Sequence, residues 1–293
     1  MLDPRYSFDT TPLKGDVALE IEVETEGCEA PYVDTDVWHS INEGSLRNNG
    51  KEYLFVRPIE YSHQEILKQV TYLSEKINDY CKMERGYVEL SDRTSVHVHV
   101  NVGRKQPYQI YNQAVFYWLY ETYFSRHFGG ESRLGNLFCL RLKDAEGMTG
   151  FLDYDLSNGA RFRSYEGGLV KYSGQNLAAV FQKGSLEYRV MKGNLDANFI
   201  AQWVEVLHTL SKKTEEFDDP CAILDACFER GPKKFLIDVL GKDIVNKIPI
   251  MDEKDFEDEV YENSFILSPC IYAQEWDNIK SRWQQRRKEF NNG

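Results

Sequence analysis

The sequence VALEIEVE at residues 17–24 alternates apolar and acidic side chains from Leu19 onward. Successive side chains of a β-strand point to opposite faces of its sheet, so a period of two predicts a half-buried strand. One face of this strand is apolar, and the other carries Glu20, Glu22 and Glu24. We therefore expect a sheet with one face against the core and one polar face.

Two further segments show the same alternation. The sequence SVHVHVNV at residues 95–102 has valines on one face. Its other face carries Ser95, His97, His99 and Asn101. In SLEYRV, at residues 185–190, the polar face carries Ser185, Glu187 and Arg189. These three strands would present carboxylates, imidazoles and a guanidinium, which are groups that bind divalent metal ions and phosphate.

Helical spacing and turn residues predict the remaining elements. Ser62 and Glu65 form a capping box, and apolar residues follow it at helical spacing. Further expected elements are short strands at 52–57 and 87–90, helices at 108–128 and 199–210, a loop at 26–50 and an irregular glycine-rich stretch at 129–170.

The 293 residues are enough for one large domain, or for one domain with an appendage. Residues 1–15 are expected to be an irregular lead-in, and residues 16–217 the main domain that contains the three polar strands. Asp218-Asp219-Pro220 then breaks the pattern. Residues 218–293 read as a mainly helical C-terminal extension, a small appendage to the sheet.

Composition narrows the classes of partner. The chain has 35 basic and 47 acidic residues, so its net charge is 35 − 47 = −12. We therefore expect no direct nucleic-acid partner and no anionic membrane surface, because both need clustered Lys and Arg. The apolar stretches are too short to span a membrane. Six widely spaced cysteines without a C-x-x-C pair favour a reducing, cytoplasmic location.

The chemistry of each polar strand allows more than one interpretation. Glu20 and Glu22 project side by side and suit Mg²⁺, although such a strand is often just a solvated face. His97 and His99 also suit Zn, Fe or Cu. Arg189 suits a phosphate group, although Glu-x-Arg is often an ordinary surface pair. The functional interpretation rests on the combination of the three strands.

A longer, ordered set of motifs includes these strands. In chain order it consists of Glu20-Ile21-Glu22, Trp38, Asn42-Glu43-Gly44-Ser45-Leu46, Glu52, Pro58, Ser95-Val96-His97-Val98-His99-Val100, Lys171-Tyr172, Gln175-Asn176-Leu177, Gly184-Ser185-Leu186-Glu187-Tyr188-Arg189, Gly193 and Trp203. The set resembles the amidoligase family, carboxylate–amine ligases related to glutamine synthetase and glutamate–cysteine ligase. The resemblance covers about residues 16–212.

The resemblance implies an α+β fold like the glutamine synthetase catalytic domain: a curved, mostly antiparallel sheet of about six strands with helices on its convex face. ATP and two or more Mg²⁺ would bind on the concave face. A substrate carboxylate would attack the γ-phosphate of ATP to give an acyl phosphate, and an amine would displace phosphate to form an amide. The substrates would be small-molecule or peptide acids and amines.

The same resemblance assigns roles to individual residues. The implied metal ligands are Glu20, Glu22, Glu52, His97 and Glu187. The implied nucleotide contacts are His99, Lys171, Asn176 and Arg189. The implied catalytic residues are Arg189, Glu187 and His97.

Other readings of the sequence stay open. A guanidino kinase would use a related sheet and the same way of holding phosphate, but with more arginines around the nucleotide. A His-x-His metal hydrolase or cupin-like protein would bind one transition metal. A non-catalytic binding protein is a further alternative. Mg²⁺-dependent nucleotide binding would support a ligase or kinase, and tight retention of Zn or Fe would support the metal protein. The sequence leaves an oligomer open.

Overall fold

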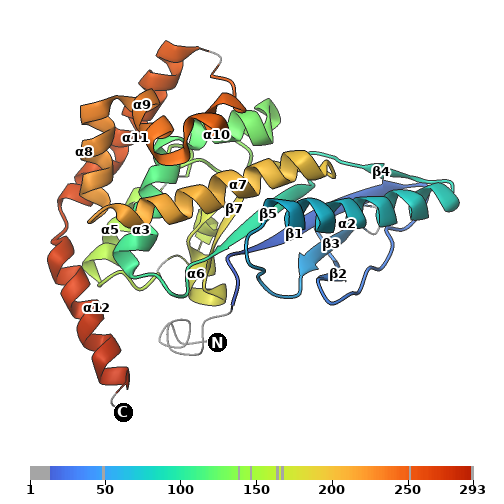
Figure 1. Ribbon diagram of the computed structural model, residues 1–293, viewed down its shortest axis with the longest axis horizontal. Helices are drawn as coiled ribbons and strands as arrows, with labels where there is room; N and C mark the ends of the chain where they lie inside the picture. The colour runs from blue at the N-terminus through green and yellow to red at the C-terminus, as the bar shows by residue number, and fades with distance from the viewer. Residues whose placement is uncertain are drawn as a thin grey trace.

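The computed structural model describes residues 14–47, 50–137, 139–145, 147–162, 165, 168–250 and 252–291. Within these ranges the chain is an α+β protein with one open sheet of seven strands, and every ladder between its named strands is antiparallel. Figure 1 shows helices along the sheet and a further group of helices beyond its end. The predicted lead-in at 1–15 lies almost wholly outside the described residues.

The sheet follows an order that differs from the order of the chain. Its strands are β1 (Val17–Glu26), β2 (Trp38–Asn42), β3 (Lys51–Phe55), β4 (Tyr87–Glu89), β5 (Ser95–Asn101), β6 (Gln175–Asn176) and β7 (Ser185–Lys192). They lie side by side as β2-β3-β1-β5-β7-β6, and β4 pairs with the C-terminal end of β1. The three predicted alternating strands are thus β1, β5 and β7, adjacent at the centre of the sheet.

Helices make up most of the remaining chain. They are α2 (His63–Met83), α3 (Pro107–Leu119), α4 (Glu121–Phe124), α5 (Met148–Ser157), α6 (Ala178–Lys183), α7 (Ala197–Lys213), α8 (Pro220–Arg230), α9 (Pro232–Leu240), α10 (Lys242–Asn246), α11 (Glu253–Tyr272) and α12 (Trp276–Asn291). A π-helical turn (Ser125–Gly129) and short 3₁₀ turns join some of them. The Ser62 side chain accepts a hydrogen bond from the Glu65 backbone N–H at the start of α2, as the capping box predicts.

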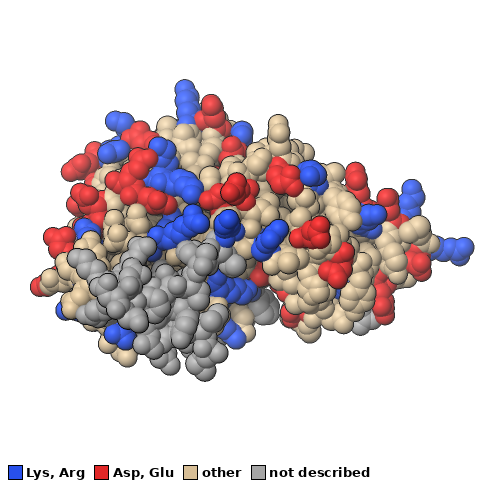
Figure 2. All heavy atoms as spheres, turned by 60° about the horizontal axis from the view of Figure 1, so that its bottom comes forward, with Lys and Arg blue, Asp and Glu red and all other residues tan. Residues whose placement is uncertain are grey.

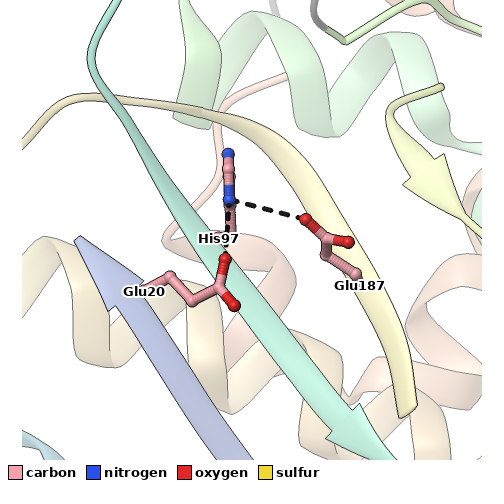
Figure 3. A group of neighbouring side chains, drawn as sticks. All are labelled: Glu20, His97 and Glu187. Atoms are coloured by element: carbon pink, nitrogen blue, oxygen red, sulfur yellow. Dashed lines mark hydrogen bonds and ion pairs between the residues drawn. The ribbon is translucent and has the colours of Figure 1, made fainter. Parts of the chain in front are cut away.

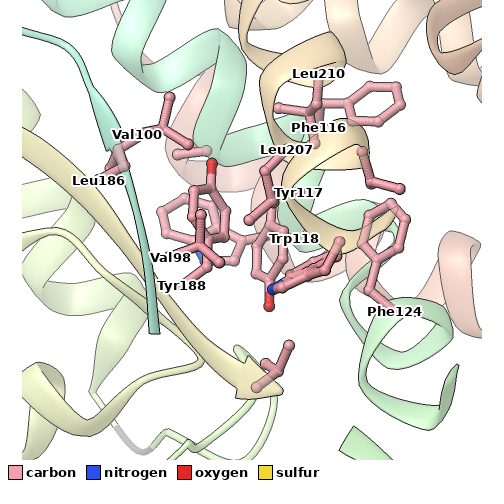
Figure 4. Packing of buried hydrophobic residues seen from close by; sticks show 14 of the residues in the cluster. Val98, Val100, Phe116, Tyr117, Trp118, Phe124, Leu186, Tyr188, Leu207 and Leu210 are labelled. Carbon is pink, nitrogen blue, oxygen red and sulfur yellow. The ribbon is translucent and has the colours of Figure 1, made fainter. Parts of the chain in front are cut away.

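The apolar face of the central strands packs against helices. In Figure 4, Val98 of β5 and Tyr188 of β7 face aromatic residues of α3 and leucines of α7. Rings of Tyr188 and Trp203 meet edge to face, with their centroids 6.3 Å apart. Burial of these large side chains is the main favourable contribution to folding. It also fixes which face of each strand is left for the polar residues, because a shift of one residue would exchange the two faces.

Four sequence-based predictions were wrong. The first strand is buried on both faces, because Glu20, Glu22 and Glu24 are almost inaccessible to solvent. The stretch 26–50, expected to be a loop, contains β2. The helix expected at 108–128 breaks at Tyr120 into α3, α4 and the π-helical turn. The glycine-rich stretch 129–170 contains α5.

The C-terminal helices share the main core. Tyr120 Oη donates a hydrogen bond to Pro232 O at 2.9 Å, and Tyr123 Oη donates one to Ile248 O at 2.7 Å. Asn263 of α11 donates from Nδ2 to Trp118 O at 3.0 Å. Buried polar groups that lose such partners are costly to the fold. The helices after residue 217 therefore contribute packing and hydrogen bonds to α3 and α4. The boundary at 217 itself stays a prediction.

The charged residues are distributed over the surface with both signs mixed. On the face drawn in Figure 2, Lys and Arg side chains gather near the centre, and Asp and Glu side chains lie around them. Among the described residues, none of the helices combines the length and the apolar character that a membrane span needs. All six cysteines are free thiols.

A buried carboxyl group lies between the sheet and the helices. Glu121, at the start of α4, accepts a hydrogen bond at Oε2 from the Leu142 backbone N–H at 2.7 Å. Its Oε1 has no hydrogen-bond partner among the described residues. A Cβ at Gly174 would lie 2.6 Å from that oxygen, so glycine leaves the room it needs. Burial raises the pKa of Glu121 to about 8.

This pKa gives the stability of the protein a defined pH dependence. The native chain keeps the Glu121 proton up to about pH 8, whereas the unfolded chain releases it near the ordinary value. The contribution of Glu121 to stability is therefore present at low pH and lost as the pH rises through about 8. We expect Glu121→Gln to reduce the fall in Tm between about pH 6 and about pH 9. Thermal unfolding followed by circular dichroism measures this, with Glu75→Gln on the exposed face of α2 as control. An equal fall in Tm for wild type and Glu121→Gln would contradict it.

Candidate functional site

The candidate site lies on the polar face of β1, β5 and β7. In the ladder of β1 and β5, Glu20 is opposite His97. In the ladder of β5 and β7, His99 is opposite Glu187. The register of β5 and β7 shifts between Val96 and Val98. Residues opposite each other in neighbouring strands have adjacent side chains, so the three polar strands form one continuous cluster.

His97 lies at the centre of this cluster. Its Nδ1 is 3.1 Å from Glu20 Oε2 and 3.5 Å from Glu187 Oε1, and Figure 3 shows the ring between the two carboxylates. Its Nε2 is 2.7 Å from Ser95 Oγ, and Ser95 donates its hydroxyl proton to Glu22. One imidazole therefore connects carboxylates from two strands and, through Ser95, reaches a third carboxylate.

His99 forms a second link. Its Nδ1 is 2.9 Å from Ser185 Oγ. Its Nε2 lies 2.9 Å from Glu20 Oε1, which is an ion pair when the ring is protonated. His99 therefore links Ser185 of β7 to Glu20 of β1 across the sheet.

Glu187 is held as a carboxylate by its neighbours. Arg189 donates from Nη1 to Glu187 Oε1, and Asn176 Nδ2 donates to Glu187 Oε2 at 2.7 Å. Burial works to raise the pKa of Glu187, but the charges of His99, Arg189 and His97 outweigh it and lower the pKa to about 2. Burial likewise opposes ionisation of Glu20, yet the same two histidines hold its pKa far below its usual value.

Glu52 has the opposite environment. It lies on β3 directly opposite Glu22 of β1. Burial raises its pKa to about 9, and the negative charges of Glu20 and Glu22 add to that effect. Two neighbouring carboxylates that cannot both ionise share a site for a positive charge, which either a proton or a metal ion supplies. Glu52 therefore lies where the negative charges of Glu20 and Glu22 act together.

A count of formal charges shows that negative side chains outnumber positive ones in the cluster. The cluster holds four carboxylates, those of Glu20, Glu22, Glu52 and Glu187. Two cationic side chains accompany them: Arg189 on Glu187, and Lys183, whose Nζ is 2.9 Å from Glu20 Oε1. With neutral histidines and all four carboxylates ionised the sum is 2 − 4 = −2, and the proton that Glu52 keeps reduces it to 2 − 3 = −1. Buried negative charge is costly unless it is paired, and either protons or a bound cation would neutralise it.

Two groups of side chains have the spacing of metal ligands. Glu20, His97 and Glu187 form one, and Glu22, Glu52 and His97 form the other, with ligand atoms within 4.8 Å of one another in each. Carboxylate oxygens dominate both sets, as Mg²⁺ and Mn²⁺ prefer, and the shared imidazole also suits Mn²⁺, Fe²⁺ and Zn²⁺. The residues present therefore fit a divalent cation.

The structure brings together eight of the nine residues that the sequence proposed for the site. These are Glu20, Glu22, Glu52, His97, His99, Asn176, Glu187 and Arg189. Lys171 is exposed, and its Nζ lies 4.7 Å from the ring centroid of Tyr172. Its nucleotide contact stays a prediction.

Three further residues take part in the cluster. Ser95 and Ser185 bond the two histidines, and their places on the polar faces of β5 and β7 were a usable signal. Lys183 precedes β7 on the short helix α6, so the two-residue period of the strands carried no signal for it.

A scan against protein-family models gives no match, and a search of the curated proteins gives none either. The chemistry of this cluster and the ordered motifs of the sequence are therefore the features that indicate a function.

We expect a divalent cation to stabilise the protein through this cluster. A ligand that binds only the native state, at about 100 times its Kd, adds about 2.7 kcal/mol to the free energy of unfolding. In a chain of this size that raises Tm by several degrees. Thermal unfolding with MgCl₂ or MnCl₂, against NaCl of equal ionic strength, measures the effect. A rise of equal size in Glu20→Gln/Glu187→Gln would place the binding elsewhere, and no rise in wild type would contradict a metal site.

Proposed function

We propose that this chain is an ATP- and Mg²⁺-dependent carboxylate–amine ligase of the amidoligase type, with a sheet like that of the glutamine synthetase catalytic domain. The observation that carries the proposal is the buried cluster itself: two sets of metal ligands share His97 on one face of an antiparallel sheet, beside Arg189. The order of the motifs along the chain supports the same assignment.

The electrostatics of the cluster suit phosphoryl transfer. The transferring phosphoryl group carries negative charge that must be neutralised, so the reaction depends mainly on positioned cations. Glu20, Glu22, Glu52, His97 and Glu187 would hold Mg²⁺, which would polarise the phosphate oxygens when bound. Cations held by these carboxylates would offset the repulsion between the negative cluster and an anionic nucleotide.

Arg189 is the side chain that we propose contacts the transferring group. Its guanidinium is already fixed by Glu187, and part of the side chain reaches solvent. A guanidinium keeps its charge and offers paired N–H donors to phosphate oxygens. Asn176 holds Glu187 from the other side, so the carboxylate keeps its orientation while Arg189 binds substrate. His99 Nε2 and Lys171 are the further proposed nucleotide contacts.

The proposed reaction has two steps. A substrate carboxylate oxygen attacks the γ-phosphorus of ATP, and the bond to ADP breaks to leave an acyl phosphate. The nitrogen of an amine then attacks the acyl carbon, the bond to phosphate breaks, and the amine gives up a proton as the amide forms. We propose small-molecule or peptide acids and amines as substrates, in the cytoplasm.

One observation favours a second candidate. His97 belongs to both ligand sets, and a mixed imidazole and carboxylate set also binds transition metals well. A metal-dependent hydrolase would use the same residues to hold Zn²⁺ or Mn²⁺ and activate water. It would need no nucleotide, which separates it from a ligase and from a guanidino kinase.

We expect the wild type, with ATP and Mg²⁺, to convert carboxylic acids to hydroxamates in the presence of hydroxylamine, with one ADP released for each hydroxamate. Hydroxylamine is a small amine that traps an acyl phosphate whatever the natural amine is. Pools of amino acids, dicarboxylic acids and short peptides supply the acid. Arg189→Lys should lower the rate about 100- to 1,000-fold, because lysine cannot offer paired donors.

Arg230→Lys provides the matched control, because Arg230 forms an exposed pair with Asp238 at 3.2 Å. Its rate should equal that of wild type. ADP released only with a guanidino compound would support the kinase instead. Absence of Mg²⁺-dependent ATP binding, together with a retained transition metal, would exclude the ligase and support the hydrolase.

A further inference from the structure

Lys183 is a cation at the edge of the cluster that neither the motifs nor the proposed reaction uses. It is the last residue of α6, and Gly184, with φ +70°, turns the chain from this helix into β7. The same short connection begins with Asn176, which bonds Glu187. The connection between β6 and β7 therefore brings Asn176 and Lys183 to the same cluster of carboxylates.

Lys183 contacts Glu20, a carboxylate of one of the two candidate metal-ligand groups. Its Nζ donates to Glu20 Oε1 at 2.9 Å, and the same oxygen lies 2.9 Å from His99 Nε2. The other oxygen, Oε2, is 3.1 Å from His97 Nδ1. Both oxygens of Glu20 thus already face nitrogen atoms.

The three side chains that contact Glu20 differ in how easily they can move away from it. The side chains of His97 and His99 are 4% and 7% exposed, and both lie on β5 inside the sheet. The side chain of Lys183 is 51% exposed. Its long stem can rotate into solvent without opening the core, and an ammonium group is readily hydrated.

We propose that Lys183 is a displaceable counter-ion of the metal site. Its ammonium neutralises Glu20 when no metal ion is bound, and a divalent cation at Glu20 displaces it. The freed ammonium then binds an anionic group of the substrate at the edge of the cluster, such as a nucleotide phosphate. Lys183 is thus a positioning residue that couples metal binding to anion binding. The second half of this role rests on the proposed nucleotide-dependent function.

The proposal predicts opposite effects on two ligands. In Lys183→Met, a metal ion no longer competes with the ammonium, so Mn²⁺ alone should bind about 10-fold more tightly. ATP in the presence of Mg²⁺ should bind about 10-fold more weakly, because a charge-assisted hydrogen bond to the anion is lost. Lys183→Arg, which keeps the charge, should stay close to wild type in both. A merely structural residue would weaken both ligands together when replaced.

The electron paramagnetic resonance signal of free Mn²⁺ measures the first affinity, and calorimetry measures the second. Lys212→Met is the matched control, because Lys212 pairs with Asp16 at 3.0 Å and its side chain is 54% exposed. It should change neither affinity. Circular dichroism verifies that each variant is folded.

The two proposals fail in different ways. Unchanged or weaker Mn²⁺ binding by Lys183→Met overturns the role of Lys183, even if the wild type binds ATP. A wild type that binds Mn²⁺ but no ATP overturns the proposed function, while tighter Mn²⁺ binding by Lys183→Met would still support the counter-ion role. A wild type that binds no Mn²⁺ at about 10 mM overturns both.

Discussion

The structure depends on the burial of carboxylates from neighbouring strands on one face of a sheet. Strict alternation in β1, β5 and β7 puts valines and aromatic rings on the core face, and so leaves no other position for the acidic residues. That face is itself buried, so water cannot hydrate its charged groups. His97, His99, Lys183 and Arg189 all lie against these carboxylates.

Neighbouring side chains balance only part of this negative charge. His97, His99 and Arg189 hold Glu187 and Glu20 in the ionised form, whereas Glu52 keeps its proton well above the ordinary pH range of a carboxyl group. Groups whose pKa values diverge within one cluster are more frequent at functional sites than elsewhere, because a fold selected for stability alone would replace them. We therefore propose that the cluster is a cation site rather than a structural network of buried ion pairs.

The two-residue period predicted the centre of the sheet and the polar residues of β1, β5 and β7, because it shows directly which side chains share a face. Glu52 and Asn176 came instead from the resemblance of the ordered motifs to a known family. The sequence did not predict β2, which has only five residues at the sheet edge, with Ile41 exposed. It also missed α5, whose segment contains Gly150 and lacks a clear apolar stripe. Burial of the polar face and the position of Lys183 depend on tertiary packing. Neither produces a periodic pattern in the sequence.

We propose above all that Glu20, His97 and Glu187 hold a divalent cation. Anomalous X-ray scattering from crystals grown with Mn²⁺ tests it most directly, because Mn²⁺ takes the same oxygen ligands as Mg²⁺ and its position is visible independently of the protein atoms. We predict an anomalous peak at coordinating distance, about 2.2 Å, from carboxylate oxygens of Glu20 and Glu187, with Lys183 moved off Glu20. Peaks only elsewhere, with Lys183 still bonded to Glu20, would contradict the account.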